Sequence, residues 1–149
     1  MKRAALPLLA ALTTVSLAPG LAHAAGAAQG ANWSKLSGNG AATLYIDKAS
    51  VARVEDAGED ARKAWTLVSH RKPQMSADGK AYRSLKAQYL YSCKEHSVTL
   101  LAQTFYPATL ARGEAVGNFK YEQYDAETPA PGSHTETAFK YVCRKKLRR

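Results

Sequence analysis

The chain has 149 residues, of which 21 are Lys or Arg and 12 are Asp or Glu, so its formal charge is +9 and its pI is about 9.7. This length holds one domain and excludes a large multidomain enzyme. Lys2, Arg3 and five of the last six residues carry most of the excess positive charge. The body between the two ends is almost neutral, so net charge does not indicate a nucleic-acid-binding protein.

Residues 1–24 have the pattern of a secretory signal peptide. A charged start is followed by an apolar run over residues 4–17 and by a small-x-small cleavage site, Ala22-His23-Ala24. The apolar run is too short for a membrane-spanning helix, no later segment is as apolar, and the signal has no cysteine to take a lipid. We therefore expect an exported protein, periplasmic or secreted, that is neither membrane-spanning nor lipid-anchored.

Residues 25–32 are small and aperiodic, and we expect a disordered leader before a domain spanning residues 33–149. Within that domain, a weak pattern over residues 115–124 predicts one or two edge strands. Four stronger segments are rich in β-branched, aromatic or alternating apolar residues, which is typical of strands. These segments are Thr43–Asp47, Lys63–His70, Arg83–Cys93 and Val98–Tyr106.

The third of these strands has the clearest alternation of apolar and polar residues. Pro73 and the Asp78-Gly79 pair predict the turn ahead of it. A period of two puts every second side chain on the same face, which we expect to be the covered face of the sheet. The residues on that face are Leu85, Ala87, Tyr89, Tyr91 and Cys93.

The period changes after Pro131 and Gly132. Ser133, followed three residues later by Glu136, is a capping box. Helical spacing of three and four then relates Thr135, Ala138, Phe139, Val142, Cys143 and Lys146. We predict a C-terminal amphipathic helix whose basic end complements its macrodipole, and hence an α+β fold with a single antiparallel sheet.

Cys93 and Cys143 are the only cysteines. Because an oxidising compartment favours pairing, we predict one disulfide between them; two free buried thiols are the alternative. A redox-active pair would need cysteines two residues apart. Cys93 shares a strand face with Tyr91, and Cys143 shares a helical stripe with Phe139. The disulfide would therefore clamp the helix onto that face of the sheet.

No motif for catalysis or metal binding stands out. His70, His96 and His134 lack the paired spacing of zinc ligands, and the carboxylates from Glu55 to Asp60 lack the spacing of a calcium loop. There is also no nucleophile elbow and no glycine-rich phosphate loop. We expect no catalytic residues, no metal, no cofactor and no enzymatic activity.

The basic tail is the candidate binding site. Its residues are Arg144, Lys145, Lys146, Arg148 and Arg149. Such a cluster can bind polyanions such as heparin, anionic lipid or nucleic acid, whereas the alternative is a solvated, frayed helix end that aids solubility. An exported protein rarely meets nucleic acid as its target, so we expect no nucleic-acid partner.

Several short elements along the domain resemble the bacterial surface-adhesin protein E family in their order and spacing. They are Trp33, Tyr45-Ile46-Asp47 with Ser50, Trp65, the block from Tyr82 to Tyr89 leading into Cys93, Thr104-Phe105-Tyr106, Gly113-Glu114 with Val116, Pro131-Gly132-Ser133 and Cys143. The resemblance covers residues 33–143.

The resemblance implies a curved antiparallel sheet of about six strands, with a C-terminal helix tethered to its concave side by the disulfide. It also implies an exported, non-enzymatic adhesin that binds host extracellular-matrix or serum proteins, such as laminin and vitronectin, and that forms a homodimer. Characterised members are lipid-anchored, and this sequence lacks the cysteine for that anchor. The alternative function is a periplasmic structural or envelope-associated protein without a host ligand. A hydrolase or small-ligand protein that uses the concave face is a third hypothesis.

Overall fold

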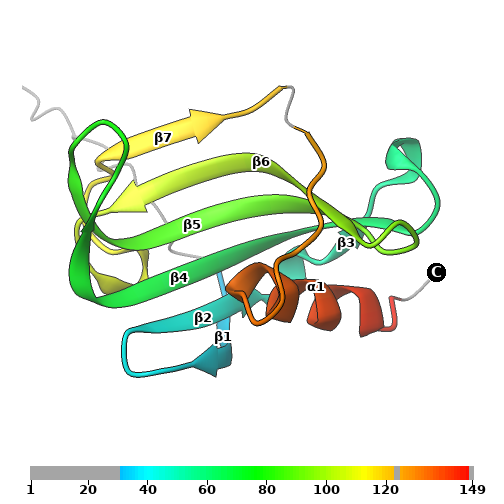
Figure 1. The fold of residues 1–149 in the computed structure, drawn as a ribbon, viewed down its shortest axis with the longest axis horizontal. Helices are drawn as coiled ribbons and strands as arrows, with labels where there is room; N and C mark the ends of the chain where they lie inside the picture. The colour runs from blue at the N-terminus through cyan, green and yellow to red at the C-terminus, as the bar shows by residue number, and fades with distance from the viewer. Residues whose placement is uncertain (1–30, 123–124, 148–149) are drawn as a thin grey trace, which may run out of the picture.

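The computed structural model describes residues 31–122 and 125–147 (Figure 1). The predicted signal peptide, residues 25–30 of the predicted leader, and Arg148 and Arg149 lie outside the described residues. Seven strands and one α-helix make up the fold: β1 Trp33–Gly38, β2 Ala42–Asp47, β3 Ala52–Arg53, β4 Ala61–Met75, β5 Ala81–Ser92, β6 Ser97–Tyr106, β7 Gly117–Lys120 and α1 His134–Arg144.

All strand pairs are antiparallel and belong to one sheet, in the order β1-β2-β4-β5-β6-β7, with the short β3 paired to β4. Figure 1 shows long, curved central strands with α1 lying across one face of the sheet. The predicted α+β class and single antiparallel sheet are confirmed, with seven strands where about six were expected.

Two boundaries differ from the prediction. β4 continues through Pro73, where the sequence predicts a turn, and the tight turn begins at Ser76, whose carbonyl accepts the N–H of Gly79 at 2.9 Å. Proline is tolerated here because the β4–β5 register jumps from Ser69 to Gln74, so that no ladder hydrogen bond is needed at Pro73. Within residues 115–122, the described part of the predicted edge segment, Gly117–Lys120 forms a strand.

The main core lies between α1 and the sheet. The face predicted from the alternation of β5 is the one that α1 covers: Tyr91 is fully buried and packs with Phe139, the ring centroids being 6.3 Å apart. The predicted disulfide joins Cys93 to Cys143 with a Cα–Cα distance of 5.5 Å, which is ordinary for such a bond. The predicted docking of the helix is therefore confirmed.

The predicted capping box starts α1. The Ser133 hydroxyl accepts the backbone N–H of Glu136 at 3.0 Å, and the Glu136 carboxylate accepts the N–H of Gly132 at 2.9 Å. The donor of the second bond is therefore the residue before the N-cap, and not the N-cap Ser133 itself. Both bonds satisfy N–H groups that would otherwise lack a partner at the start of the chain's only described α-helix.

A second, smaller core lies on the opposite face. It consists of Leu67, Tyr106 and Ala111, and the 3-10 turn Thr109–Ala111 covers it. The buried hydroxyl of Ser84 holds this turn: it donates to the Ala108 carbonyl at 2.6 Å and accepts the N–H of Ala111 at 2.9 Å. The sheet is thus covered on both faces, by α1 on one and by this turn on the other.

Tyr91 carries a buried hydroxyl with no hydrogen-bond partner among the described residues. Burial raises the pKa of Tyr91, so the group stays protonated. Because an unsatisfied buried hydroxyl costs about 1 kcal/mol or more, the variant Tyr91→Phe should raise the free energy of unfolding by about 1 kcal/mol. Urea unfolding measures the change, and a loss of stability would show that the hydroxyl has a bound partner.

Candidate binding site at the end of the C-terminal helix

The structure places three of the five predicted basic-tail residues together at the end of α1. Arg144 is the last residue of the helix, Lys145 is its C-cap and Lys146 follows. The side chains of Arg144 and Lys146 are exposed, and Lys145 is half-buried. These cations therefore form a surface cluster at a defined helix end.

Arg62 of β4 fixes that helix end. It is only 6% exposed, and its Nη1 donates to the carbonyls of Val142 and Lys145, each at 2.7 Å. Its Nε and Nη2 donate to the Asp60 carboxylate at 2.9 to 3.1 Å. The guanidinium therefore makes five hydrogen bonds, through all three of its nitrogens. The helix end is thus held to the sheet through Lys145.

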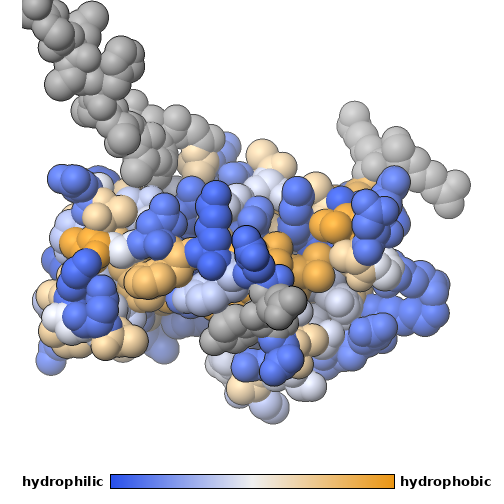
Figure 2. Space-filling view, turned by 90° about the horizontal axis from the view of Figure 1, so that it is seen from above, coloured by the Kyte–Doolittle hydropathy of each residue, from blue (hydrophilic) through white to orange (hydrophobic). Residues whose placement is uncertain are grey.

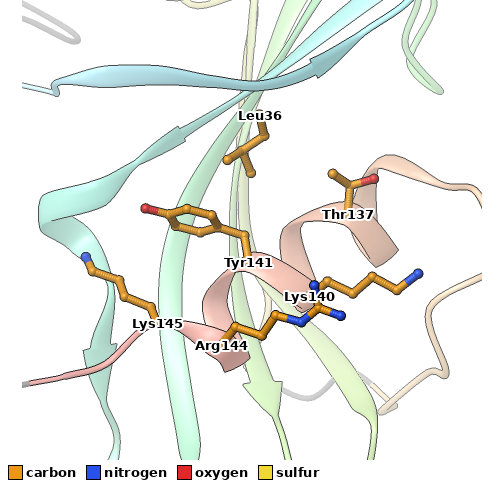
Figure 3. A pocket seen from close by; sticks show the side chains of 6 residues that line it. All are labelled: Leu36, Thr137, Lys140, Tyr141, Arg144 and Lys145. Atoms are coloured by element: carbon orange, nitrogen blue, oxygen red, sulfur yellow. The ribbon is translucent and has the colours of Figure 1, made fainter.

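A pocket of about 480 Å³ lies beside this helix end, between α1 and the edge strand β1 (Figure 3). Its lining residues are Leu36, Thr137, Lys140, Tyr141, Arg144 and Lys145. Leu36 reaches from β1 toward the helix, and the other five side chains come from α1 and its C-cap (Figure 3). The pocket has a small apolar floor of Leu36 and Tyr141 and a rim of three cations.

A β-bulge aims Leu36 at the pocket. Lys35 pairs with Tyr45 and Ser37 pairs with Leu44, so Leu36 is an extra residue in the β1–β2 ladder. Such a bulge redirects a side chain, and Leu36 packs against the core under α1. Edge strands commonly carry bulges of this kind.

The rim carries a net positive charge, because no carboxylate lines the pocket. Lys140 forms an ion pair with Glu136 at 2.7 Å, and the Lys145 ammonium donates to the backbone carbonyl of Lys48. Arg144, at the helix C-terminus, has an exposed guanidinium. An anion in the pocket would meet these cations together with the apolar floor.

Sequence reasoning missed five of the residues that build this site: Leu36, Arg62, Thr137, Lys140 and Tyr141. Helical spacing could have indicated two of them, because Lys140 and Tyr141 precede Arg144 and Lys145 by four residues. Neither the bulge nor the long-range capping by Arg62 has a local sequence signal.

Two of the three candidate histidines contact aromatic rings. His96 contacts the Phe139 ring edge-on, with centroids 4.5 Å apart, and His70 contacts Tyr82 at 5.8 Å. Over residues 31–122 and 125–147 no group of three His, Cys, Asp or Glu side chains is arranged to hold a metal ion. Burial lowers the pKa of His70, and the nearby His134 lowers it further.

The His70 pKa makes stability depend on pH. Well above pH 6.5 His70 is neutral in both states, and as the pH falls through about 6.5 the unfolded chain binds a proton that the folded chain resists. The free energy of unfolding should therefore fall on acidification from pH 7.5 to 5.5. His70→Gln should reduce this fall in urea unfolding series, whereas an identical pH slope in the variant would contradict the assignment.

A row of aromatic rings crosses the sheet away from this site. Tyr82 contacts Phe105 at 4.8 Å and Phe105 contacts Phe119 at 5.8 Å, all edge-on, and Phe119 is 39% exposed on β7. Figure 2, viewed from above relative to Figure 1, shows small hydrophobic patches divided by hydrophilic side chains. The apolar surface in this view is therefore divided into small areas.

A single antiparallel sheet with a C-terminal helix tethered to it by a disulfide defines a small α+β domain. The profile of the surface-adhesin protein E family matches residues 33–144, which is most of the chain, and the chain belongs to this family. The family resemblance noted in the sequence is thus confirmed. No curated protein sequence matches the chain significantly.

Two solved structures share the fold. Crystal form II of Haemophilus influenzae protein E is 17% identical, with 67% of this chain and 79% of that chain covered and a TM-score of 0.53. Protein E from non-typeable Haemophilus influenzae is 20% identical, with 87% of this chain and 82% of that chain covered and a TM-score of 0.54.

Family membership supports a surface adhesin, and therefore an exported protein and a binding function. None of the helices in the described part of the chain is long and apolar enough to cross a membrane.

Proposed function

We propose that this protein is an exported, non-enzymatic adhesin that binds anionic surfaces of host extracellular-matrix or serum proteins, or polyanions such as heparin, through the cationic end of α1. One observation carries the proposal: Lys140, Arg144 and Lys145 line one pocket that has no lining carboxylate. Arg62 holds the end of the helix in place, so these cations are presented on a fixed support. A preordered cationic surface loses less conformational entropy when it binds an anion.

Binding of this kind depends on salt. At physiological ionic strength the Debye length is about 8 Å, so added salt should weaken binding to immobilised heparin steeply. Reversing two exposed charges, Arg144→Glu with Lys146→Glu, should lower heparin affinity at least about 10-fold by surface plasmon resonance, because attraction becomes repulsion.

The matched control reverses two exposed cations elsewhere, Lys63→Glu on β4 with Lys120→Glu on β7, and changes the net charge equally. Heparin affinity should then change far less. Equal weakening by the two double variants would show a diffuse charge effect and refute the role of the helix end. The same pairs of variants can be tested on immobilised laminin and vitronectin.

Export to the cell exterior is the second part of the proposal. Labelling intact cells with a membrane-impermeant biotin reagent should modify the exposed lysines of the protein if it is displayed. Labelling only after the outer envelope is permeabilised would instead support the periplasmic, envelope-associated alternative without a host ligand.

A further inference from the structure

The pocket between β1 and α1 combines two features that bear on its ligand. Its rim has the cations Lys140, Arg144 and Lys145, and its floor has the apolar side chains Leu36 and Tyr141. Its volume of about 480 Å³ falls within the range of about 300 to 1,000 Å³ of sites that bind small ligands. A polyanion without apolar groups would use the rim and leave the floor unoccupied.

We propose that this pocket binds an extended acidic peptide segment of a partner protein, with one apolar side chain of the peptide on the floor and flanking carboxylates on the rim. The inference rests on the proposed function and names the chemical class of the partner at the same helix end.

The spacing of the rim cations fits an extended chain. Lys140 and Arg144 are four residues apart on α1, which corresponds to about 6 Å along the helix axis. Alternate side chains of an extended peptide lie about 6.6 Å apart on one side. An apolar side chain on the floor and carboxylates two positions before and after it project to the same side of an extended chain, so they can face the pocket and its cations together.

The β1 side of the pocket also suits an extended peptide. β1 is an end strand of the sheet, so one edge of its backbone is unpaired by the sheet, and its Leu36 lines the pocket. An extended segment can use such an edge for hydrogen bonds while a side-chain pocket supplies specificity. A lipid acyl chain would need a longer apolar surface than the two side chains, Leu36 and Tyr141, that form this floor.

The test uses a fluorescein-labelled peptide, Glu-Asp-Glu-Phe-Glu-Asp-Glu, and a matched peptide with Gly in place of Phe. Fluorescence anisotropy with the purified chain should give an affinity about 10-fold higher for the Phe peptide, because only its ring can fill the floor. Arg144→Glu should weaken both peptides at least about 10-fold. The distant reversal Lys120→Glu should leave both affinities within about 2-fold.

Filling the pocket distinguishes the contribution of the apolar floor to peptide binding from that of the cationic rim. Leu36→Trp should abolish the preference for the Phe peptide over the Gly peptide. If this variant fails to fold, Thr137→Phe fills the pocket from the helix side and should have the same effect. Equal binding of the two peptides by the unmodified chain, or a preference that survives filling, would overturn the inference. Pocket-dependent binding to phosphatidylglycerol vesicles in place of the peptide would also overturn it.

The two proposals can fail separately. Heparin binding that depends on Arg144 and Lys146, without any preference for the Phe peptide, would overturn the peptide site and leave the adhesin function standing. A preference for the Phe peptide without heparin or matrix-protein binding would support the pocket and count against the proposed function.

Discussion

Replacing both cysteines, Cys93→Ala with Cys143→Ala, is expected to lower the free energy of unfolding by about 4 kcal/mol. The disulfide spans 50 positions of sequence, and closing a loop of this length restricts the unfolded chain by about that amount in the chain-entropy model. This loss is comparable to the net stability of many small domains. Urea unfolding followed by circular dichroism should show a midpoint shifted to much lower urea concentration.

The control for this prediction is the unmodified chain in reductant. Both cysteines are only half-buried, so the loss of side-chain volume in the double variant should add little. The reduced chain and the variant should therefore unfold at similar urea concentrations. A variant within about 1 kcal/mol of the oxidised chain would show that α1 is held to the sheet mainly by packing of Phe139 and Val142.

Replacing Arg62 by Met should lower the free energy of unfolding by about 3 kcal/mol. The change leaves the carbonyls of Val142 and Lys145 and the Asp60 carboxylate without their guanidinium partner. Removing one member of a buried charged network costs about 3 to 5 kcal/mol, and the partial exposure of Asp60 places the expected value at the lower end. Arg62→Lys should restore only part of the loss, because an ammonium cannot reproduce the planar fork.

Arg53 offers a matched control. Its guanidinium lies 3.9 Å from the same Asp60 carboxylate, but its side chain is 51% exposed. Arg53→Met should therefore change stability by less than about 0.5 kcal/mol, as is usual for a surface ion pair. If the two arginine variants were equally stable, Arg62 would not be the residue that holds the helix end. Hydrogen exchange at the Lys145 amide should accelerate in Arg62→Met and not in Arg53→Met.

Local patterns in the sequence were sufficient for most of the fold. Alternation in β5 identified the face that carries Tyr91 and Cys93, because a strand turns its side chains to opposite sides at a fixed period. The Ser133–Glu136 spacing located the start of α1, because capping needs only neighbouring residues. With only two cysteines in an exported chain, the disulfide followed without knowledge of the fold.

Other features depend on residues that are distant in the sequence. The continuation of β4 past Pro73 depends on how β5 pairs with it, since proline is compatible with a strand where the ladder is interrupted. The 3-10 turn over the second core is held by Ser84, which lies 24 to 27 residues away from its partners. Such contacts have no local periodicity.

The sequence alone determined that five basic residues end the chain, that an amphipathic helix precedes them and that the domain resembles the protein E family. Only the tertiary structure decided what surrounds Arg144, Lys145 and Lys146. Arg62 reaches the helix end from 80 residues away, and the bulge in β1 brings Leu36 to the same pocket. Charge and periodicity are local properties that a sequence displays, whereas a pocket forms only when distant segments pack together. Here that packing gives the cationic helix end an apolar floor.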